Sequence, residues 1–220
     1  FQGTEPIRGF GAVAGVYEEA CQIVVRADSE ISTVEELEGH RVSVGEEESG
    51  TKQNALQILA AYGLNEKLVE EVSLNYTEAA KELENGSIDA FFCTAGAQTA
   101  AIANLAQRTG IRFLNVDGAA AARLKKSYPV YDSCIIAAGT YPGQEEDVST
   151  VGVKAVLLAS DSVSAEVVEE LTALLFEEQQ ELDFALPVEL ITEADAAADG
   201  LPVPFHKGAE RYYELSLIHI

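Results

Sequence analysis

The chain has 220 residues and is strongly acidic, with 37 Asp and Glu against 14 Lys and Arg and a formal net charge of -23. This balance argues against a nucleic-acid-binding protein, because such proteins neutralise phosphates with basic residues, and it also disfavours an anionic membrane surface. Hydrophobic residues make up 47% of the chain, which is typical of a globular protein and too high for a disordered one.

The ends of the chain carry their own signals. No apolar run approaches the ~20 residues of a membrane-spanning helix, so the protein is not expected to span a membrane itself. The sequence starts at Phe1 and contains no methionine, so we expect an N-terminal part to be missing. The last six residues, 215–220, resemble a translated sequencing adapter. We expect them to be a non-native tail and exclude His219 as a functional residue.

The first 40 residues predict one strand and one short helix. Residues 1–15 are glycine-rich and are expected to be irregular. The β-branched run 21–26 is typical of a buried strand. Ser32 or Thr33 is expected to cap a short helix through Leu37, which Gly39 ends.

Residues 41–128 alternate strand and helix four times. The strands are predicted at 41–44, 71–75, 88–93 and 111–116, and the helices at 51–62, 77–84, 97–108 and 119–127. This alternation predicts a parallel α/β sheet with helices on its faces. After Pro129 we expect strands at 133–138 and 151–159, an amphipathic helix at 164–182, and helical pieces at 188–198 and 208–213.

The sequence offers no catalytic, metal or cofactor site. The three histidines show no zinc-ligand spacing, no GxSxG elbow is present, and no P-loop or GxGxxG sequence follows a strand. The three cysteines each lie in an apolar run and are interpreted as buried free thiols. A Cys93–Cys134 disulfide is left open.

The candidate binding residues lie in two strand-to-helix turns. Ser49, Gly50 and Thr51 follow the strand at 41–44, and Thr94, Ala95 and Gly96 follow the strand at 88–93. Open α/β sheets bind ligands at the carboxyl ends of their strands, and a helix N-terminus favours an anion. The competing interpretation is that Ser49 or Thr51 only caps the helix.

Five motifs in order carry a resemblance to a known family. They are Val-Ser-Val-Gly…Ser-Gly-Thr…Asn-Ala…Ile-Leu (42–59), Glu-Ala-Ala…Gly-Ser-Ile-Asp-Ala-Phe-Phe-Cys-Thr-Ala-Gly (78–96), Tyr-Pro-Val-Tyr (128–131), Ala-Gly-Thr-Tyr-Pro-Gly-Gln-Glu-Glu-Asp-Val-Ser-Thr-Val (138–151) and Gly-Leu-Pro-Val-Pro-Phe-His-Lys-Gly-Ala-Glu-Arg-Tyr-Tyr (200–213). Over nearly all of residues 10–214 the chain resembles the TAXI-type solute-binding subunit of tripartite ATP-independent periplasmic (TRAP) transporters.

The resemblance implies a type II periplasmic-binding-protein fold, with two α/β lobes and a hinge and with the N-terminal part of lobe one missing. It divides the chain into a remnant of lobe one (1–34), a complete lobe two (35–132) and a crossing that returns to lobe one (133–214). It implies that Ser49, Gly50, Thr51 and Asn54 lie on a ligand-facing helix start. It further implies that Thr94, Ala95 and Gly96 lie on the neighbouring turn and that Tyr17 lies near the cleft.

The sequence differs from the family pattern at Glu46, Glu47 and Glu48. The family usually has small residues or proline at these positions. Three acids beside an anion site would repel a carboxylate unless they point to solvent. The charge of the ligand is therefore left open at this stage.

The function expected from the sequence is that of a receptor without enzymatic activity. It is expected to be periplasmic or extracytoplasmic, to bind a small organic acid or amino acid such as glutamate, and to deliver it to a TRAP permease. Anchoring through a lipid on the N-terminal segment is left open. The alternative is an enzyme or sensor domain on the same bilobal fold that binds a phosphate ester.

Overall fold

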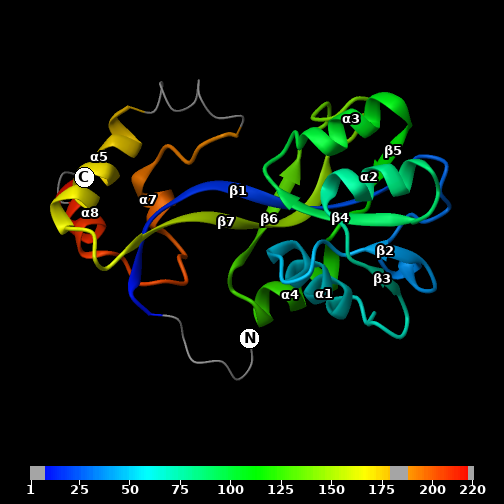
Figure 1. Ribbon diagram of the computed structural model, residues 1–220, viewed down its shortest axis with the longest axis horizontal. Helices are drawn as coiled ribbons and strands as arrows, with labels where there is room; N and C mark the ends of the chain where they lie inside the picture. Colours follow the sequence, from blue (N-terminus) through cyan, green and yellow to red (C-terminus); the bar gives the residue numbers. More distant parts are fainter. Residues whose placement is uncertain (1–7, 179–187, 218–220) are drawn as a thin grey trace. The chain divides into compact units, whose positions relative to one another are not determined.

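The computed structural model describes residues 8–178 and 188–217 (Figure 1). By packing, the chain divides into two compact units, unit 1 (Phe1–Glu18 with Lys154–Ile220) and unit 2 (Glu19–Val153). The lobe boundaries predicted near residues 34 and 132 stay a prediction.

Strands and helices alternate along most of the described chain. The strands are β1 (Phe10–Arg26), β2 (Arg41–Ser43), β3 (Glu70–Val72), β4 (Ala90–Ala95), β5 (Ile111–Phe113), β6 (Tyr131–Ile136) and β7 (Val148–Ser160). The helices are the 3₁₀ turn η1 (Glu35–Leu37), α1 (Gly50–Ala61), α2 (Tyr76–Glu84), α3 (Ala100–Arg108), α4 (Gly118–Ser127), α5 (Ala165–Glu177), α7 (Ala194–Ala198) and α8 (Lys207–Leu217). The predicted α/β class is confirmed.

The sheet is mixed, whereas the sequence predicts a parallel one. Its order is β3-β2-β4-β1-β7-β6, with β5 also paired to β1. β2 runs parallel to β3 and β4, but β1 is antiparallel to β4 and β5. The strand–helix alternation of residues 41–128 does describe the parallel part. It carries no information about β1, which precedes that stretch and inserts beside β4.

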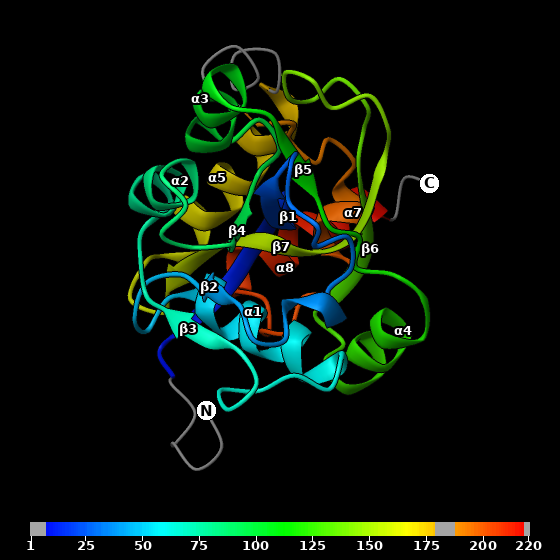
Figure 2. The ribbon, with the colours of Figure 1, turned by 90° about the vertical axis from the view of Figure 1, so that its right-hand side faces the viewer.

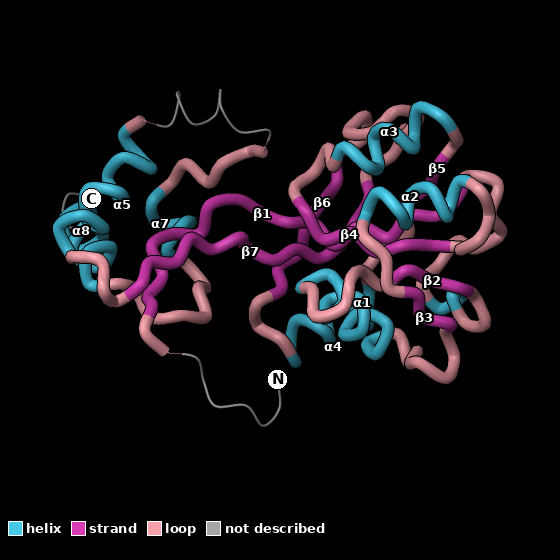
Figure 3. The backbone as a smooth tube through the Cα atoms, in the orientation of Figure 1, coloured by secondary structure: helices cyan, strands magenta, loops and turns pink. Residues whose placement is uncertain are grey.

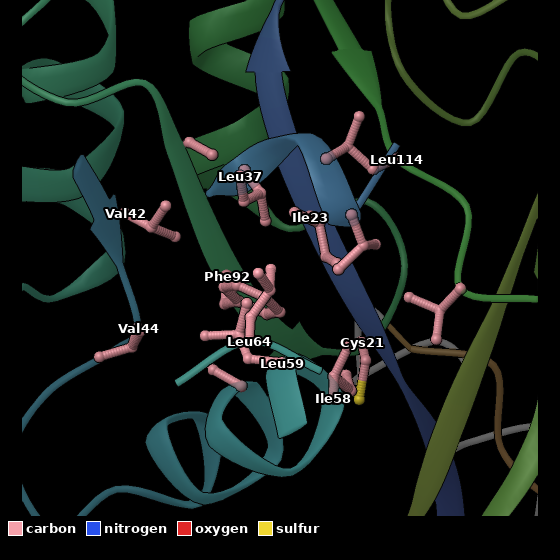
Figure 4. Close-up of a cluster of buried hydrophobic side chains, with 14 of the residues drawn as sticks. Cys21, Ile23, Leu37, Val42, Val44, Ile58, Leu59, Leu64, Phe92 and Leu114 are labelled. Carbon is pink, nitrogen blue, oxygen red and sulfur yellow. The ribbon is translucent and has the colours of Figure 1, made fainter. Parts of the chain in front are cut away.

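Unit 2 has a hydrophobic core on each face of its sheet. On β1, Cys21, Ile23 and Val25 face one cluster, while Ala20 and Val24 face the other, as the period-2 alternation of a strand requires. The first cluster packs under α1 and α4 and the second under α2 and α3, which lie on opposite sides of the strands in Figure 2. Figure 4 shows side chains of the first cluster, among them Ile23, Ile58, Leu59 and Phe92.

Unit 1 is organised around the packing of α5 against α8 (Figure 3). Gly208, in the first turn of α8, makes this approach close, because a Cβ there would lie 2.3 Å from the Ala165 carbonyl oxygen and 2.8 Å from the Glu169 nitrogen. Val168 of α5 and Tyr213 of α8 are buried in the same apolar cluster. Among the described helices, none is long and apolar enough to cross a membrane.

The expectation that residues up to Gly15 are irregular is wrong from Phe10 onward, where β1 begins; residues 1–7 lie outside the described ones. Gly11 explains the error. A Cβ on Gly11 would lie 2.5 Å from the His206 nitrogen, so this glycine permits close backbone contact within an ordered strand. Ala12 pairs there with Phe205 in an isolated parallel bridge.

Helix starts also differ from the prediction. The short helix before Gly39 is the 3₁₀ turn η1, whose N-cap is Val34 and not Ser32 or Thr33. Helix α2 is capped by Asn75 in a capping box with Glu78 and not by Thr77, and α3 starts after Thr99 and not at Ala97. The piece predicted at 188–198 is helical only over Ala194–Ala198, because Leu190 forms a β-bridge with Tyr17. Helix α5 starts as predicted after Ser164, and the predicted segment 179–182 lies outside the described residues.

The contact at Gly208 predicts a difference between two glycines that both lie in a first helical turn. Gly208→Ala should lower the free energy of unfolding by about 1–3 kcal/mol, because the added methyl group overlaps backbone atoms of α5. Gly50→Ala is the matched control, since nothing lies within 4 Å of its Cβ position; it should leave stability unchanged or raise it by about 0.4–1 kcal/mol. Urea unfolding followed by circular dichroism measures both. Equal stability of the two variants would contradict the packing described.

Candidate ligand-binding site

The two predicted turns lie at the same edge of the sheet in unit 2. β2 and β4 are parallel neighbours, with Ser43 opposite Phe91, so their carboxyl ends point the same way. Helix α1 starts after β2, and β4 runs directly into the turn at Gly96. A hydrogen bond from Asn54 Nδ2 to Thr94 Oγ1 (3.2 Å) joins the two segments. The structure thus brings together residues that the sequence separates by 40 positions.

Ser49 is the N-cap of α1. Its hydroxyl oxygen accepts a hydrogen bond from the Lys52 N–H at 3.1 Å. Its O–H donates a hydrogen bond to the Glu46 carbonyl oxygen at 2.7 Å. Both hydrogen-bonding roles of Ser49 are therefore used within the turn. The N–H groups of Gly50 and Thr51 have no intrahelical acceptor at this position, and they point out of the positive end of the helix dipole.

Thr51 and Tyr76 form the first polar contact behind this helix start. Thr51 is 6% exposed, and its Oγ1 lies 2.6 Å from the Tyr76 hydroxyl. Tyr76 donates its one proton to the Thr94 carbonyl oxygen at 2.9 Å. Thr51 is therefore the donor to Tyr76, and the contact ties α1, α2 and the end of β4 together.

Asn54 and Tyr131 form the second contact. The Tyr131 hydroxyl lies 2.9 Å from Asn54 Oδ1 and 2.7 Å from Gln57 Oε1. Thr94, which accepts from Asn54, donates in turn to the Cys21 sulfur at 3.7 Å. A chain of neutral groups thus runs from β6 through α1 and β4 to β1.

A third set of bonds supports the turn after β4. Thr99 Oγ1 donates to the Gly96 carbonyl oxygen (2.9 Å), and the Thr99 N–H donates to the Tyr141 hydroxyl (3.0 Å). Tyr141 donates to Gln22 Oε1 at 2.6 Å, and Gln22 Nε2 donates back to Thr99 Oγ1 at 3.3 Å. The ring is closed, so the backbone of this turn is held without a ligand.

The acids before α1 take no part in the hydrogen bonds described above for this network. Glu46, Glu47 and Glu48 are exposed, and the Glu47 carboxylate accepts from Lys52 Nζ and from Ser73 Oγ, both at 2.7 Å. The Lys52 hydrogen bond is the main cause of the lowered pKa of Glu47, followed by that of Ser73. Lys52 and Glu47 thus form an ion pair at 2.7 Å, in which each charge is offset by the other.

The network itself is uncharged. Burial raises the pKa of the Tyr76 and Tyr131 hydroxyls, and it raises the pKa of the Cys21 and Cys93 thiols to about 12. The negative charge of Glu19, on β1, adds a smaller upward contribution to the pKa of Tyr76. These groups hold their protons at neutral pH and act as neutral donors and acceptors.

The sequence-predicted residues thus have different places. Thr51, Asn54 and Thr94 belong to the network; Ser49 caps the helix, Gly50 presents its N–H, and Ala95 and Gly96 shape the turn. Tyr17 belongs to unit 1, where it is half-buried and bridges Leu190. Sequence reasoning missed the partners Tyr76, Tyr131, Tyr141, Gln22, Gln57 and Thr99. Two of the quoted motifs did contain such partners: Tyr-Pro-Val-Tyr contains Tyr131, and the motif at 138–151 contains Tyr141.

The cysteines of the described chain are free thiols, two buried and one, Cys134, partly exposed, so the disulfide left open between Cys93 and Cys134 is not formed. No group of three or more His, Cys, Asp or Glu side chains in the described ranges is arranged to hold a metal ion.

Tyr76→Phe should lower the free energy of unfolding by about 1–3 kcal/mol, because it leaves the Thr94 carbonyl and the buried Thr51 hydroxyl without their partner. Tyr128→Phe is the matched control, since the Tyr128 side chain is 41% exposed and no hydrogen bond of its hydroxyl is recorded in the described structure. It should be neutral in the same urea titration. A neutral Tyr76→Phe would show that this contact does not hold α1 to β4.

The buried thiols predict a loss of stability at alkaline pH. Their pKa rises on folding from 9.0 to about 12, so their contribution is fully present below pH 9 and declines as the pH approaches 12. The free energy of unfolding should fall between pH 9 and 10.5 in wild type. The slope should be smaller in the Cys21→Ala/Cys93→Ala variant, and identical slopes would refute the assignment.

Among solved structures, the chain is similar to the periplasmic aliphatic sulphonate-binding protein SsuA from Escherichia coli, at 18% identity and a TM-score of 0.48 over 95% of this chain and 65% of that one. It is also similar to the alkanesulfonate-binding protein SsuA from Xanthomonas axonopodis pv. citri bound to MOPS (18%, TM-score 0.49, 94% and 59%). A third match is an ancestral arginine-binding protein bound to glutamine (17%, TM-score 0.42, 78% and 60%).

The chain thus spans less than two thirds of the length of these proteins. Residues 1–214 match the NMT1-like family, so the chain belongs to that family.

Proposed function

We propose that this chain is a solute receptor of the TAXI type that binds a small carboxylate or an amino acid such as glutamate. The observation that carries the proposal is the start of α1, where unpaired N–H groups stand beside a neutral network at the carboxyl edge of parallel strands. The five ordered motifs of the sequence and the membership in the NMT1-like family support it. The receptor would hand its ligand to a TRAP membrane permease outside the cytoplasm; free and lipid-anchored forms both remain open.

The ligand chemistry follows from what the edge offers. The N–H groups of Gly50 and Thr51 and one N–H of Asn54 are donors that the described network does not use. Backbone N–H donors at a helix N-terminus can bind a carboxylate even when no Lys or Arg side chain pairs with it.

The same features favour a binding protein over an enzyme or a phosphate-ester sensor. A phosphate ester carries up to two negative charges and is commonly held by Arg or Lys. The nearest cation described at α1, Lys52, is paired with Glu47 at 2.7 Å. The tyrosine hydroxyls and the buried thiols of the network have raised pKa values, which is the opposite of an activated nucleophile.

A thermal-shift screen of the 220-residue chain tests the proposal. Glutamate, other amino acids and dicarboxylates form one set of ligands, and sugar phosphates and nucleotides form the other. A carboxylate or amino acid at 100 times its dissociation constant should add about 2.7 kcal/mol to the free energy of unfolding. Stabilisation by phosphate esters alone, or by no carboxylate, would overturn the proposal.

Gly50→Pro tests the helix start directly. Proline at the first helical position lacks an N–H but keeps the helical backbone, so this variant removes one proposed ligand donor and leaves the fold intact. Affinity for the carboxylate found in the screen should fall about tenfold, which corresponds to about 1.4 kcal/mol. Gly50→Ala keeps the N–H and is the control; the same loss in both variants would assign the effect to crowding.

A further inference from the structure

Tyr131 contacts the candidate site only through other side chains. It lies on β6, is 2% exposed, and places its hydroxyl between Asn54 and Gln57 on α1. Asn54 lies one helical turn after Gly50 and Thr51, and residues three and four apart are neighbours on a helix surface. Asn54 therefore lies on the same face of α1 as the helix start, one turn further along.

The oxygen and the NH₂ group of an asparagine amide have nearly the same shape, but the oxygen accepts hydrogen bonds and the NH₂ group donates them. Only the hydrogen-bond partners decide which of the two groups points in a given direction. Asn54 has two such partners, Tyr131 and Thr94. If Tyr131 donates to Oδ1, then Nδ2 faces Thr94 and its second N–H is left for a ligand. If the Asn54 amide rotated so that Oδ1 and Nδ2 exchanged places, the oxygen would stand where the second N–H had been, and the ligand would meet an acceptor.

The single proton of Tyr131 decides between these arrangements. The hydroxyl faces two oxygen atoms, Gln57 Oε1 at 2.7 Å and Asn54 Oδ1 at 2.9 Å, and it can donate fully to only one. Gln57 is partly exposed, so its amide can turn and donate to Tyr131. A one-directional chain then runs from Gln57 through Tyr131, Asn54 and Thr94 to Cys21, in which each hydroxyl donates once and accepts once.

The side chains in this series of hydrogen bonds stay uncharged at neutral pH. Burial raises the pKa of the Tyr131 hydroxyl, which keeps it protonated as a donor. The hydrogen bonds that link Gln57, Tyr131, Asn54, Thr94 and Cys21 join neutral side chains. The polarity of the Asn54 amide is therefore set by hydrogen bonds alone.

We propose that Tyr131 is a positioning residue that fixes the Asn54 amide with its oxygen toward β6 and an N–H toward the start of α1, so that the site selects a carboxylate over the corresponding carboxamide. The proposal rests on the proposed function for the identity of the site. It adds the residue that sets acid-versus-amide discrimination.

The ligand-dependent experiment compares glutamate with glutamine by isothermal titration calorimetry. Wild type should bind glutamate more tightly. Tyr131→Phe should lower the glutamate-to-glutamine affinity ratio about tenfold, since the freed amide can then present its oxygen to the carboxamide. Tyr128→Phe is the control, because its ring lies 6.3 Å from that of Tyr131, and it should keep the wild-type ratio. An unchanged ratio in Tyr131→Phe would overturn the proposal.

The ligand-free experiment separates this proposal from the proposed function. In ¹⁵N-correlated NMR spectra, the two Asn54 side-chain protons should be well separated in wild type and in Tyr128→Phe. In Tyr131→Phe the chemical shifts of these two protons should approach each other, and the protons should exchange faster with water. Circular dichroism should show the same fold. Identical Asn54 signals in wild type and Tyr131→Phe would refute the positioning role. If wild type binds neither amino acid, the proposed function fails, and the NMR result still decides the role of Tyr131.

Discussion

The parallel pairing of β2 with β4 is the constraint on which the candidate site depends. Because the two strands run the same way, the start of α1 and the turn after β4 lie at one edge, and Asn54 reaches Thr94. Had β4 been antiparallel to β2, its carboxyl end would lie at the opposite edge of the sheet. The core supports this pairing on both faces, since Val42 and Phe92 pack under α1 while Phe91 packs under α2.

The network at this edge is built from hydroxyl, amide and thiol groups. Neutral groups of this kind cost less to bury than ions, provided that each finds a partner. Thr51, Tyr76, Asn54, Thr94 and Tyr131 all do so before any ligand is present. A preformed network lowers the entropy that binding must overcome, because these side chains already occupy one arrangement.

Much of the unit 2 fold could be predicted from the sequence. The helices α1, α2 and α4 lie within a residue or two of their predicted ranges, because their apolar residues recur at helical spacing. Glycines follow the ends of α1 and α2, and Pro129 follows the end of α4. The direction of β1 could not be predicted, since a strand pattern carries no information about its neighbour. Gly11 was misread for a related reason: only the position of His206, almost 200 residues later, shows why a glycine stands there.

The candidate site was predictable only in part. Ser49–Thr51 and Thr94–Gly96 are local signals, visible wherever a strand ends before a helix. Tyr76, Tyr131 and Tyr141 act through hydroxyls that reach across the sheet, and no local pattern distinguishes such a tyrosine from one that fills a core. The pairing of Glu47 was equally hidden, because it depends on where Lys52 and Ser73 lie.

The burial of Cys21 and Cys93 has a consequence for how the chain must be handled before it folds. In the native protein both thiols are shielded, but in the unfolded chain they are ordinary thiols that oxidants can reach. Wrong disulfides that involve Cys21 or Cys93 are therefore a hazard of the unfolded chain and not of the folded protein. A reductant present during refolding therefore protects these two thiols until β1 has paired with β4 and buried them.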